Sequence, residues 1–255
     1  LPACNHKTTG DHSWMLMALN YYENKTGDTS YAQMARDAVA YLETMRNTNP
    51  ADEEYGSVNF CTGGSSCTNP TAISTEHNVD AFSAFYNRAF LETDTGLVRK
   101  AELIEAYLAR EIWAPSPLSN SFQTLALFWI GFNDFARDTD PQSWTVLSLG
   151  PEGPNGEDFT DALNWLETNG HGGAGVRTSQ ELDSQQVDGF MEAILADPEF
   201  IWVEGTEGVA AAYYYIGNDY LGDYFHGEMG KAVTDNGGVL YLSLIHISEP
   251  TRPED

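Results

Sequence analysis

A short polar cluster followed at once by an apolar helical segment recurs four times in this chain, and this repeat constrains the fold more than any other feature. The clusters contain His12, Glu76, Gln142 and Glu204, which stand 64, 66 and 62 residues apart. A period longer than one helix indicates a repeated supersecondary unit. We therefore expect one structural unit to be used four times, with the polar clusters at corresponding places.

Each cluster begins a predicted helix, and a turn signal and a second helix follow, so that each unit is an antiparallel hairpin. The first helices are apolar nearly all round, whereas the second helices have one charged face. A helix of the first kind is buried on both sides, and a helix of the second kind covers it. The predicted pairs are 13–24 with 30–47, 76–91 with 97–108, 142–149 with 159–169, and 204–216 with 220–233.

Inner helices surrounded by outer helices describe an α/α toroid, in which the inner helices start on the same rim. The sequence therefore predicts an all-α fold, an incomplete α/α toroid of helical hairpins whose polar clusters converge. Long loops connect the hairpins, and long loops in a compact domain are usually functional. These loops are 48–75, 113–139 and 170–203, and their apolar stretches 126–132 and 199–203 are expected to pair as short β-strands on one face.

The charge of the chain is strongly negative, with 38 acidic against 12 basic residues and a formal net charge of -26. Such a chain repels nucleic acid and anionic lipid, so we expect neither as a partner. No run of 18 apolar residues occurs, and the sequence therefore predicts no membrane span. With 255 residues, of which 42% are apolar, the chain is long enough for one large domain with a hydrophobic core.

Both ends of the chain are expected to be cut. The chain starts with Leu1 rather than Met, and no signal-peptide pattern follows. Residues 242–252 read LSLIHISEPTR and resemble a translated sequencing adaptor, as in an open reading frame from a metagenomic assembly. We therefore expect 1–241 to be a single toroid domain and 242–255 to be a non-native tail.

Two of the three cysteines, Cys61 and Cys67, bracket the segment CTGGSSC, whose glycines and serines allow a local disulfide. A disulfide and free thiols remain open as alternatives, whereas zinc is disfavoured because no His stands at metal-ligand spacing. The acidity and a disulfide both suit an extracellular or periplasmic protein.

Several motifs resemble those of the six-hairpin glycosidase superfamily. They are STEHNVDAF at 74–82, DPQSWTVLSLG at 140–150, WVEGT at 202–206 and the Gly-Asp-x-x-Tyr turn at 27–31. The resemblance implies a ring of six hairpins, of which four are visible here. It also implies a carbohydrate-active enzyme, because the superfamily includes hydrolases, polysaccharide lyases, phosphorylases and sugar epimerases.

Glycoside hydrolysis uses one carboxylic acid as proton donor and a second carboxylate as base or nucleophile. Glu76 and Glu204 lie two hairpins apart and can face each other across the mouth of the ring, with Asp140 as a third candidate. We expect Glu204 to be the general acid and Glu76 or Asp140 the base, although these roles can be exchanged. The alternative for each acid is a capping role at a helix N-terminus, which is also the simplest role for Asp11 and His12.

Other polar and aromatic residues near the helix starts are candidates for substrate binding. Indole rings stack on sugar rings, and amide or hydroxyl groups bind sugar hydroxyls, but an ordinary core role is the alternative for the tryptophans, Trp14 included. The predicted substrate-binding residues are His77, Asn78, Gln142, Trp144, Trp202 and Thr206.

No cofactor or metal site is predicted. Asp183 and Asp188 invite a calcium interpretation, but their spacing does not match a calcium loop. Nucleotide-binding, zinc-protease and serine-esterase motifs are absent from the sequence. The sequence thus predicts a glycoside hydrolase acting on an oligo- or polysaccharide. The alternatives are a non-catalytic glycan-binding or scaffold protein and a polysaccharide lyase, the latter disfavoured because the acidic chain would repel uronates.

Overall fold

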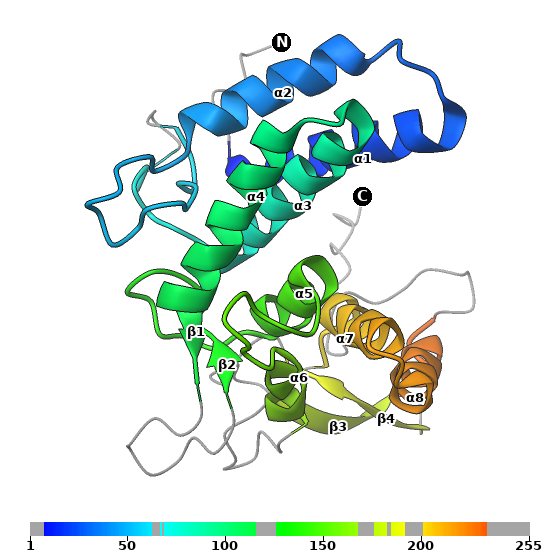
Figure 1. Cartoon of the computed structure of the whole chain (residues 1–255). Coiled ribbons are helices and arrows are strands. Elements are labelled where there is room, and N and C mark those ends of the chain that lie inside the picture. The colour runs from blue at the N-terminus through cyan, green and yellow to red at the C-terminus, as the bar shows by residue number, and fades with distance from the viewer. Residues whose placement is uncertain are drawn as a thin grey trace, which may run out of the picture.

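The computed structural model describes residues 8–62, 67, 69–115, 126–167, 176–182, 185–191 and 201–233. Within these residues the chain forms four helical hairpins, arranged one after another (Figure 1). They are α1 (Thr9–Thr26) with α2 (Ala32–Thr44), α3 (Thr75–Glu92) with α4 (Thr95–Tyr107), α5 (Thr139–Leu149) with α6 (Thr160–Leu166), and α7 (Val203–Tyr215) with α8 (Asp219–Gly230). A π-helical turn at Leu108–Ile112 continues α4. The four predicted hairpins are all confirmed.

The first helix of each hairpin is the inner one. α1 packs against α3, α3 against α5 and α5 against α7, while each outer helix packs on the inner helix of its own hairpin. One continuous hydrophobic core runs through all four hairpins. The predicted α/α toroid architecture is therefore confirmed. None of the described helices is long and apolar enough to span a lipid bilayer.

The inner helices differ in burial, and here the prediction was only partly right. Most side chains of α3 and the first two turns of α5 are buried, as an all-round apolar pattern predicts. α1 has the same type of sequence but neighbours on fewer sides. It buries only Thr9, Gly10, Ser13, Leu16 and Asn20, and it exposes large side chains such as Trp14, Met15, Tyr21 and Tyr22.

A two-stranded antiparallel sheet, formed by β1 (Trp113–Ala114) and β2 (Leu127–Phe128), lies below the α4 end in Figure 1. The predicted strand in 126–132 is thus present. Its predicted partner was wrong, because β2 pairs with the residues that follow α4 and not with 201–203, the described part of the stretch 199–203.

A second antiparallel pair, β3 (Arg177–Leu182) and β4 (Gln185–Phe190), was not predicted. Its strands are rich in Gln, Ser and acidic residues, so their hydrophobic alternation is weak. The Trp202 amide donates a hydrogen bond of 2.8 Å to the Phe190 carbonyl. Residues 201–203, the described part of the predicted stretch 199–203, therefore meet the end of β4 and lead directly into α7.

Cys61 and Cys67 form a disulfide, so the predicted local bridge is confirmed. Cys61 also forms a β-bridge with Thr8, the residue that caps α1. The disulfide therefore constrains a loop that is attached to the start of an inner helix.

Candidate functional site

Three acidic residues occupy the same position in three consecutive inner helices. Glu76, Asp140 and Glu204 are each the second residue of α3, α5 and α7, at intervals of 64 residues. The corresponding residue of α1 is Gly10. Because the inner helices pack side by side and start at the same end, the three carboxyl groups gather at one rim.

The structure corrects the repeat register. His12 and Gln142 are not equivalent to Glu76, because they are the fourth residues of their helices. The His12 ring stacks on Tyr41 with centroids 3.9 Å apart, and its Nδ1 lies 2.9 Å from the Thr8 carbonyl. The Asp11 amide donates to the Thr8 hydroxyl, as expected at a capped helix start.

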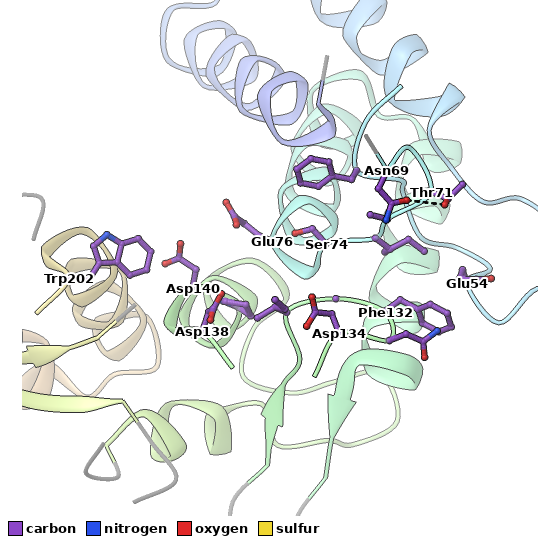
Figure 2. Close-up of a pocket in the computed structure, with 17 residues that line it drawn as sticks. Glu54, Asn69, Thr71, Ser74, Glu76, Phe132, Asp134, Asp138, Asp140 and Trp202 are labelled. Atoms are coloured by element: carbon purple, nitrogen blue, oxygen red, sulfur yellow. Dashed lines mark hydrogen bonds between the residues drawn. The ribbon is translucent and has the colours of Figure 1, made fainter. Parts of the chain in front are cut away.

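A cleft of about 650 Å³ opens beside the starts of α3 and α5. Glu76 and Asp140 extend from these helices toward a shared space, and Trp202 lies across from Asp140 (Figure 2). The described residues that line the cleft include no Lys or Arg. Further acidic and aromatic wall residues are Glu54, Phe60, Phe132, Asp134 and Asp138.

Glu76 is half-buried in this cleft, and its pKa is raised above the ordinary value. Burial is the larger cause, because it disfavours the charged form, and the negative charge of Glu204 is the second. These two effects outweigh the helix macrodipole, which favours an anion at a helix N-terminus. Glu204 is itself exposed and does not line the cleft, but its charge acts on Glu76.

Asp80 is a functional candidate that the sequence analysis missed. It lies one helical turn after Glu76 on the same face of α3, and only 4% of it is exposed. Its pKa is raised to about 8, first by burial and then by the charge of Glu76, against a hydrogen bond from Trp14. The signal was present in STEHNVDAF, as an acid spaced i, i+4 from Glu76 within an apolar helix.

His77 was predicted to bind substrate, but the structure places it between α1 and the loop before α3. Its ring stacks on Phe60 at 4.3 Å, nearly parallel. A Cβ on Gly10 would stand 2.8 Å from the His77 ring, so only glycine fits at that position. Burial lowers the pKa of His77. The arrangement is that of a packed, neutral ring at a helix seam.

Asn78, Gln142 and Thr206 were also predicted to bind substrate, and all three are fully buried. They are the fourth residues of α3, α5 and α7, again 64 residues apart. Each accepts a hydrogen bond from a backbone amide of the preceding loop and donates one to the carbonyl four residues back. The amide partners belong to Val58, Phe128 and Phe190.

The first residues of α1, α3 and α5 hold the same three loop segments from the other side. The hydroxyl groups of Thr9, Thr75 and Thr139 donate to backbone carbonyls that lie 50 to 54 residues further along. These carbonyls belong to Asn59, Trp129 and Met191. Each loop is thus bonded to two successive inner helices. The polar residues that recur with the repeat therefore have two different uses, attachment of loops and formation of the cleft.

Trp202 and Trp144 occupy different places. Trp202 lines the cleft and packs over Gly205, where a Cβ would stand 2.3 Å from the indole. Trp144 lies one turn after Asp140 on α5, where its ring meets Trp14 of α1 edge to face at 5.9 Å. Trp144 therefore belongs to a separate cavity further along the inner helices.

Among the described residues, no three His, Cys, Asp or Glu side chains are grouped so that they could hold a metal ion. Asp188, considered above for calcium, accepts hydrogen bonds from Ser179 and Tyr224 and lies 3.8 Å from Arg177. These partners lower the pKa of Asp188. Asp183, the other residue of that interpretation, lies outside the described residues.

Comparison of the fold with solved structures finds carbohydrate-active enzymes. A family 76 glycoside hydrolase from a bovine Bacteroides thetaiotaomicron strain matches with a TM-score of 0.59 and 10% identity, over 92% of this chain and 50% of that one. A family 76 mannosidase from B. thetaiotaomicron matches with a TM-score of 0.60 and 8% identity, over 92% and 63%. A D-mannose isomerase matches with a TM-score of 0.57 and 12% identity, over 93% and 63%.

These likenesses show the fold: the chain has the α/α toroid fold of these three structures. The chain spans 50% to 63% of the length of these structures. No protein-family model and no curated protein sequence matches the chain.

Proposed function

We propose that this protein is a glycoside hydrolase that uses the acids at the starts of its inner helices. The observation that supports this proposal is the repeated placement of Glu76, Asp140 and Glu204, two of which line one cleft while the third acts electrostatically on Glu76. A capping role alone does not require carboxyl groups at three equivalent positions. Sugar hydrolysis does require at least two carboxyl groups with different proton affinities.

We assign Glu76 as the general acid, because its raised pKa favours the protonated form that can donate to a leaving oxygen. Asp140 and Glu204 are the candidates for the carboxylate that activates water or attacks the sugar carbon. This assignment exchanges the roles expected from sequence, where Glu204 was the acid. The exchange rests on the burial of Glu76, which the sequence does not encode locally.

The substrate class we propose is a neutral oligo- or polysaccharide. An acidic cleft wall in which no described residue is Lys or Arg repels uronates, which counts against a polysaccharide lyase. Phe132 and Phe60 supply apolar surface for sugar rings, together with the edge of Trp202, which is only 6% exposed. Because two of the structural neighbours are a mannosidase and a mannose isomerase, manno-oligosaccharides of two to six units are the first probes. The disulfide and the acidity support a place outside the cytoplasm.

The test is the release of new reducing ends from these oligosaccharides. Glu76→Gln and Asp140→Asn are expected to lower turnover by about 10²-fold or more, as loss of an acid or base does. Glu204→Gln distinguishes a direct catalytic role of Glu204 from an electrostatic effect on Glu76. Only a direct role gives a loss of turnover as large as that of Glu76→Gln or Asp140→Asn. Glu102→Gln, on the exposed face of α4, is the matched control. Full activity of Glu76→Gln and Asp140→Asn would contradict the assignment.

The alternatives give different results in the same experiment. A glycan-binding or scaffold protein would bind the oligosaccharides and release no reducing ends. A sugar isomerase would convert mannose to a ketose without cleaving any glycosidic bond.

A further inference from the structure

One helical turn beyond the carboxylates, the inner helices form a second set of equivalent positions. These are occupied by Trp14 of α1, Asp80 of α3, Trp144 of α5 and Gly208 of α7. Each stands four residues after the second residue of its helix, so each points to the same side as the acid or glycine before it. The second set therefore lies on the inner face, behind the rim.

A cavity of about 180 Å³ lies at this level, separate from the cleft. It is walled by the indoles of Trp14 and Trp144, by Asp80, by Met17, Ser83 and Leu147, which stand three residues further along the same helices, and by Ser148. A liquid water occupies about 30 Å³, so the cavity has room for a body of the size of one monosaccharide. A Cβ on Gly208 would stand 3.2 Å from the Trp144 indole nitrogen, so the glycine leaves room for the indole ring.

The carboxyl group in this cavity is an unusual one. Asp80 is 96% buried, counted from its 4% exposure, and among the described residues its Oδ2 has no hydrogen-bond partner. An unsatisfied buried carboxyl oxygen costs free energy, which a ligand hydroxyl can recover. The group most able to affect its charge is Glu76, four residues earlier on α3. The other side chains that line the cavity do not titrate.

We propose that Trp14, Asp80 and Trp144 form a sugar-binding subsite in the inner wall, in which an indole packs on a neutral pyranose ring and the Asp80 carboxyl hydrogen-bonds a ring hydroxyl. Two indoles that meet edge to face present an apolar wall, and the Asp80 carboxyl group, with the hydroxyl groups of Ser83 and Ser148, orients the ring. A protonated carboxyl both donates and accepts, as a sugar hydroxyl does. The inference rests on the proposed function, because the ligand class is carbohydrate.

The test measures binding of the same manno-oligosaccharides by calorimetry, with every variant made in the Glu76→Gln background so that cleavage does not interfere. Trp14→Ala and Trp144→Ala are expected to weaken binding about tenfold or more, as loss of an aromatic side chain that a ligand covers does. Trp129→Ala is the matched control, because its indole packs on Phe135 and Arg137 and lines neither cavity. Near-native circular dichroism is required of each variant.

Two variants of Asp80 separate hydrogen bonding from packing. Asp80→Asn keeps a donor and an acceptor, so we expect affinity to stay within about threefold of the parent. Asp80→Leu keeps the volume without the polar atoms, and we expect about a tenfold loss. Equal affinities of these two variants would overturn the role of Asp80.

Different results would contradict the subsite and the proposed glycoside hydrolase function. If the unmodified chain cleaves manno-oligosaccharides but the Trp14 and Trp144 variants bind them as tightly as the Trp129 variant, only the subsite is wrong. If the unmodified chain neither cleaves nor binds them, the proposed function fails for this class of glycan, and the subsite fails with it.

Discussion

The inner helices α1 and α3 have similar sequences and very different surroundings. Both are 18 residues long, both begin after a hydroxyl cap at Thr8 or Ser74, and both are rich in apolar side chains. α3 packs against α1 on one side and α5 on the other. Among the described inner helices, α1 packs mainly against α3 and touches α5 through the contact of Trp14 with Trp144. The result is an α3 with most of its side chains buried and a half-exposed α1. An apolar pattern therefore defines which side chains can be buried, and the number of neighbouring helices decides which of them are.

Charged side chains of α3 also lie in buried or half-buried surroundings. On α3, Arg88 is 1% exposed and pairs with Glu23 of α1 and with Glu92, at 2.6 and 2.5 Å. At the other end of α3, Glu76 is half-buried and Asp80 is buried, and the pKa values of both are raised. α3 is thus the helix on which substitutions of charged residues have the largest effects.

The largest effect is expected from Arg88→Ala. It leaves two acids without their buried cation, and breaking a buried ion pair in this way costs about 3–5 kcal/mol of the free energy of unfolding. Arg36→Ala is the control, because Arg36 is half-exposed and lies 3.6 Å from the same Glu92, so that its loss costs about 1 kcal/mol or less. Urea denaturation measures both. Equal losses of free energy of unfolding would show that the buried ion pairs of Arg88 contribute no more to stability than the exposed one of Arg36.

The next effect is expected from pH. Because the pKa of Asp80 is raised to about 8, the folded state holds its proton more tightly than the unfolded state. This contribution to stability is complete below the unfolded pKa of about 3.9 and is lost as pH rises through 8. We expect a loss of about 3–4 kcal/mol between pH 5 and pH 8, at most about 1.4 kcal/mol per pH unit.

Asp80→Asn removes this titration and should reduce the slope to the part that Glu76 contributes, because the pKa of Glu76 is raised as well. Asp37→Asn, which makes the same charge change on the exposed face of α2, should keep the whole slope. The measurement is the free energy of unfolding in urea at four pH values. Parallel curves for the two variants would contradict the interpretation.

A smaller effect is expected from Gln142→Ala on α5. Its amide group makes three hydrogen bonds, two to the Phe128 backbone and one to the Asp138 carbonyl. Leaving such buried groups unsatisfied costs about 1–3 kcal/mol. Gln33→Ala on exposed α2 is the control, with an expected change within about 0.5 kcal/mol. Thermal unfolding followed by circular dichroism measures the melting temperatures of both variants. Equal melting temperatures would show that Gln142 does not hold the loop.

The smallest effect is expected on α1. Tyr21 is 66% exposed, and Tyr21→Ala should change the free energy of unfolding by no more than about 0.5 kcal/mol. Urea denaturation checks this as well. A loss above about 1 kcal/mol would mean that this face of α1 is covered in solution, and the contrast with α3 would then be smaller than the structure indicates.

Local patterns were enough to predict much of the fold. Turn residues such as Gly27, which adopts a φ of 69°, mark the hairpins, and hydrophobic periodicity marks the helices between them. The glycines and serines between Cys61 and Cys67 were enough to suggest the disulfide. The hairpin β3–β4 was missed because its residues lack a clear alternation of apolar and polar side chains.

The site was harder to predict, because residues with the same sequence signal have different uses. Glu76 and Asn78 belong to one polar cluster, yet Glu76 faces the cleft and Asn78 holds the Val58 backbone. Two positions along a helix correspond to a rotation of about 200°, so neighbours in a cluster point to opposite sides. Counting polar residues found the cluster, but it did not say which member faces the cleft.

The sequence by itself determined four helical hairpins of one kind, their order and the acids that recur at their starts, because these depend on periodicity, caps and turns within a few residues. Only the tertiary structure decided that Glu76, Asp140 and Glu204 are equivalent, that Gln142 and Thr206 serve the loops, and that Asp80 is buried beside two indoles. Burial and charge interactions depend on groups that lie tens of residues apart in the chain, and packing brings them together.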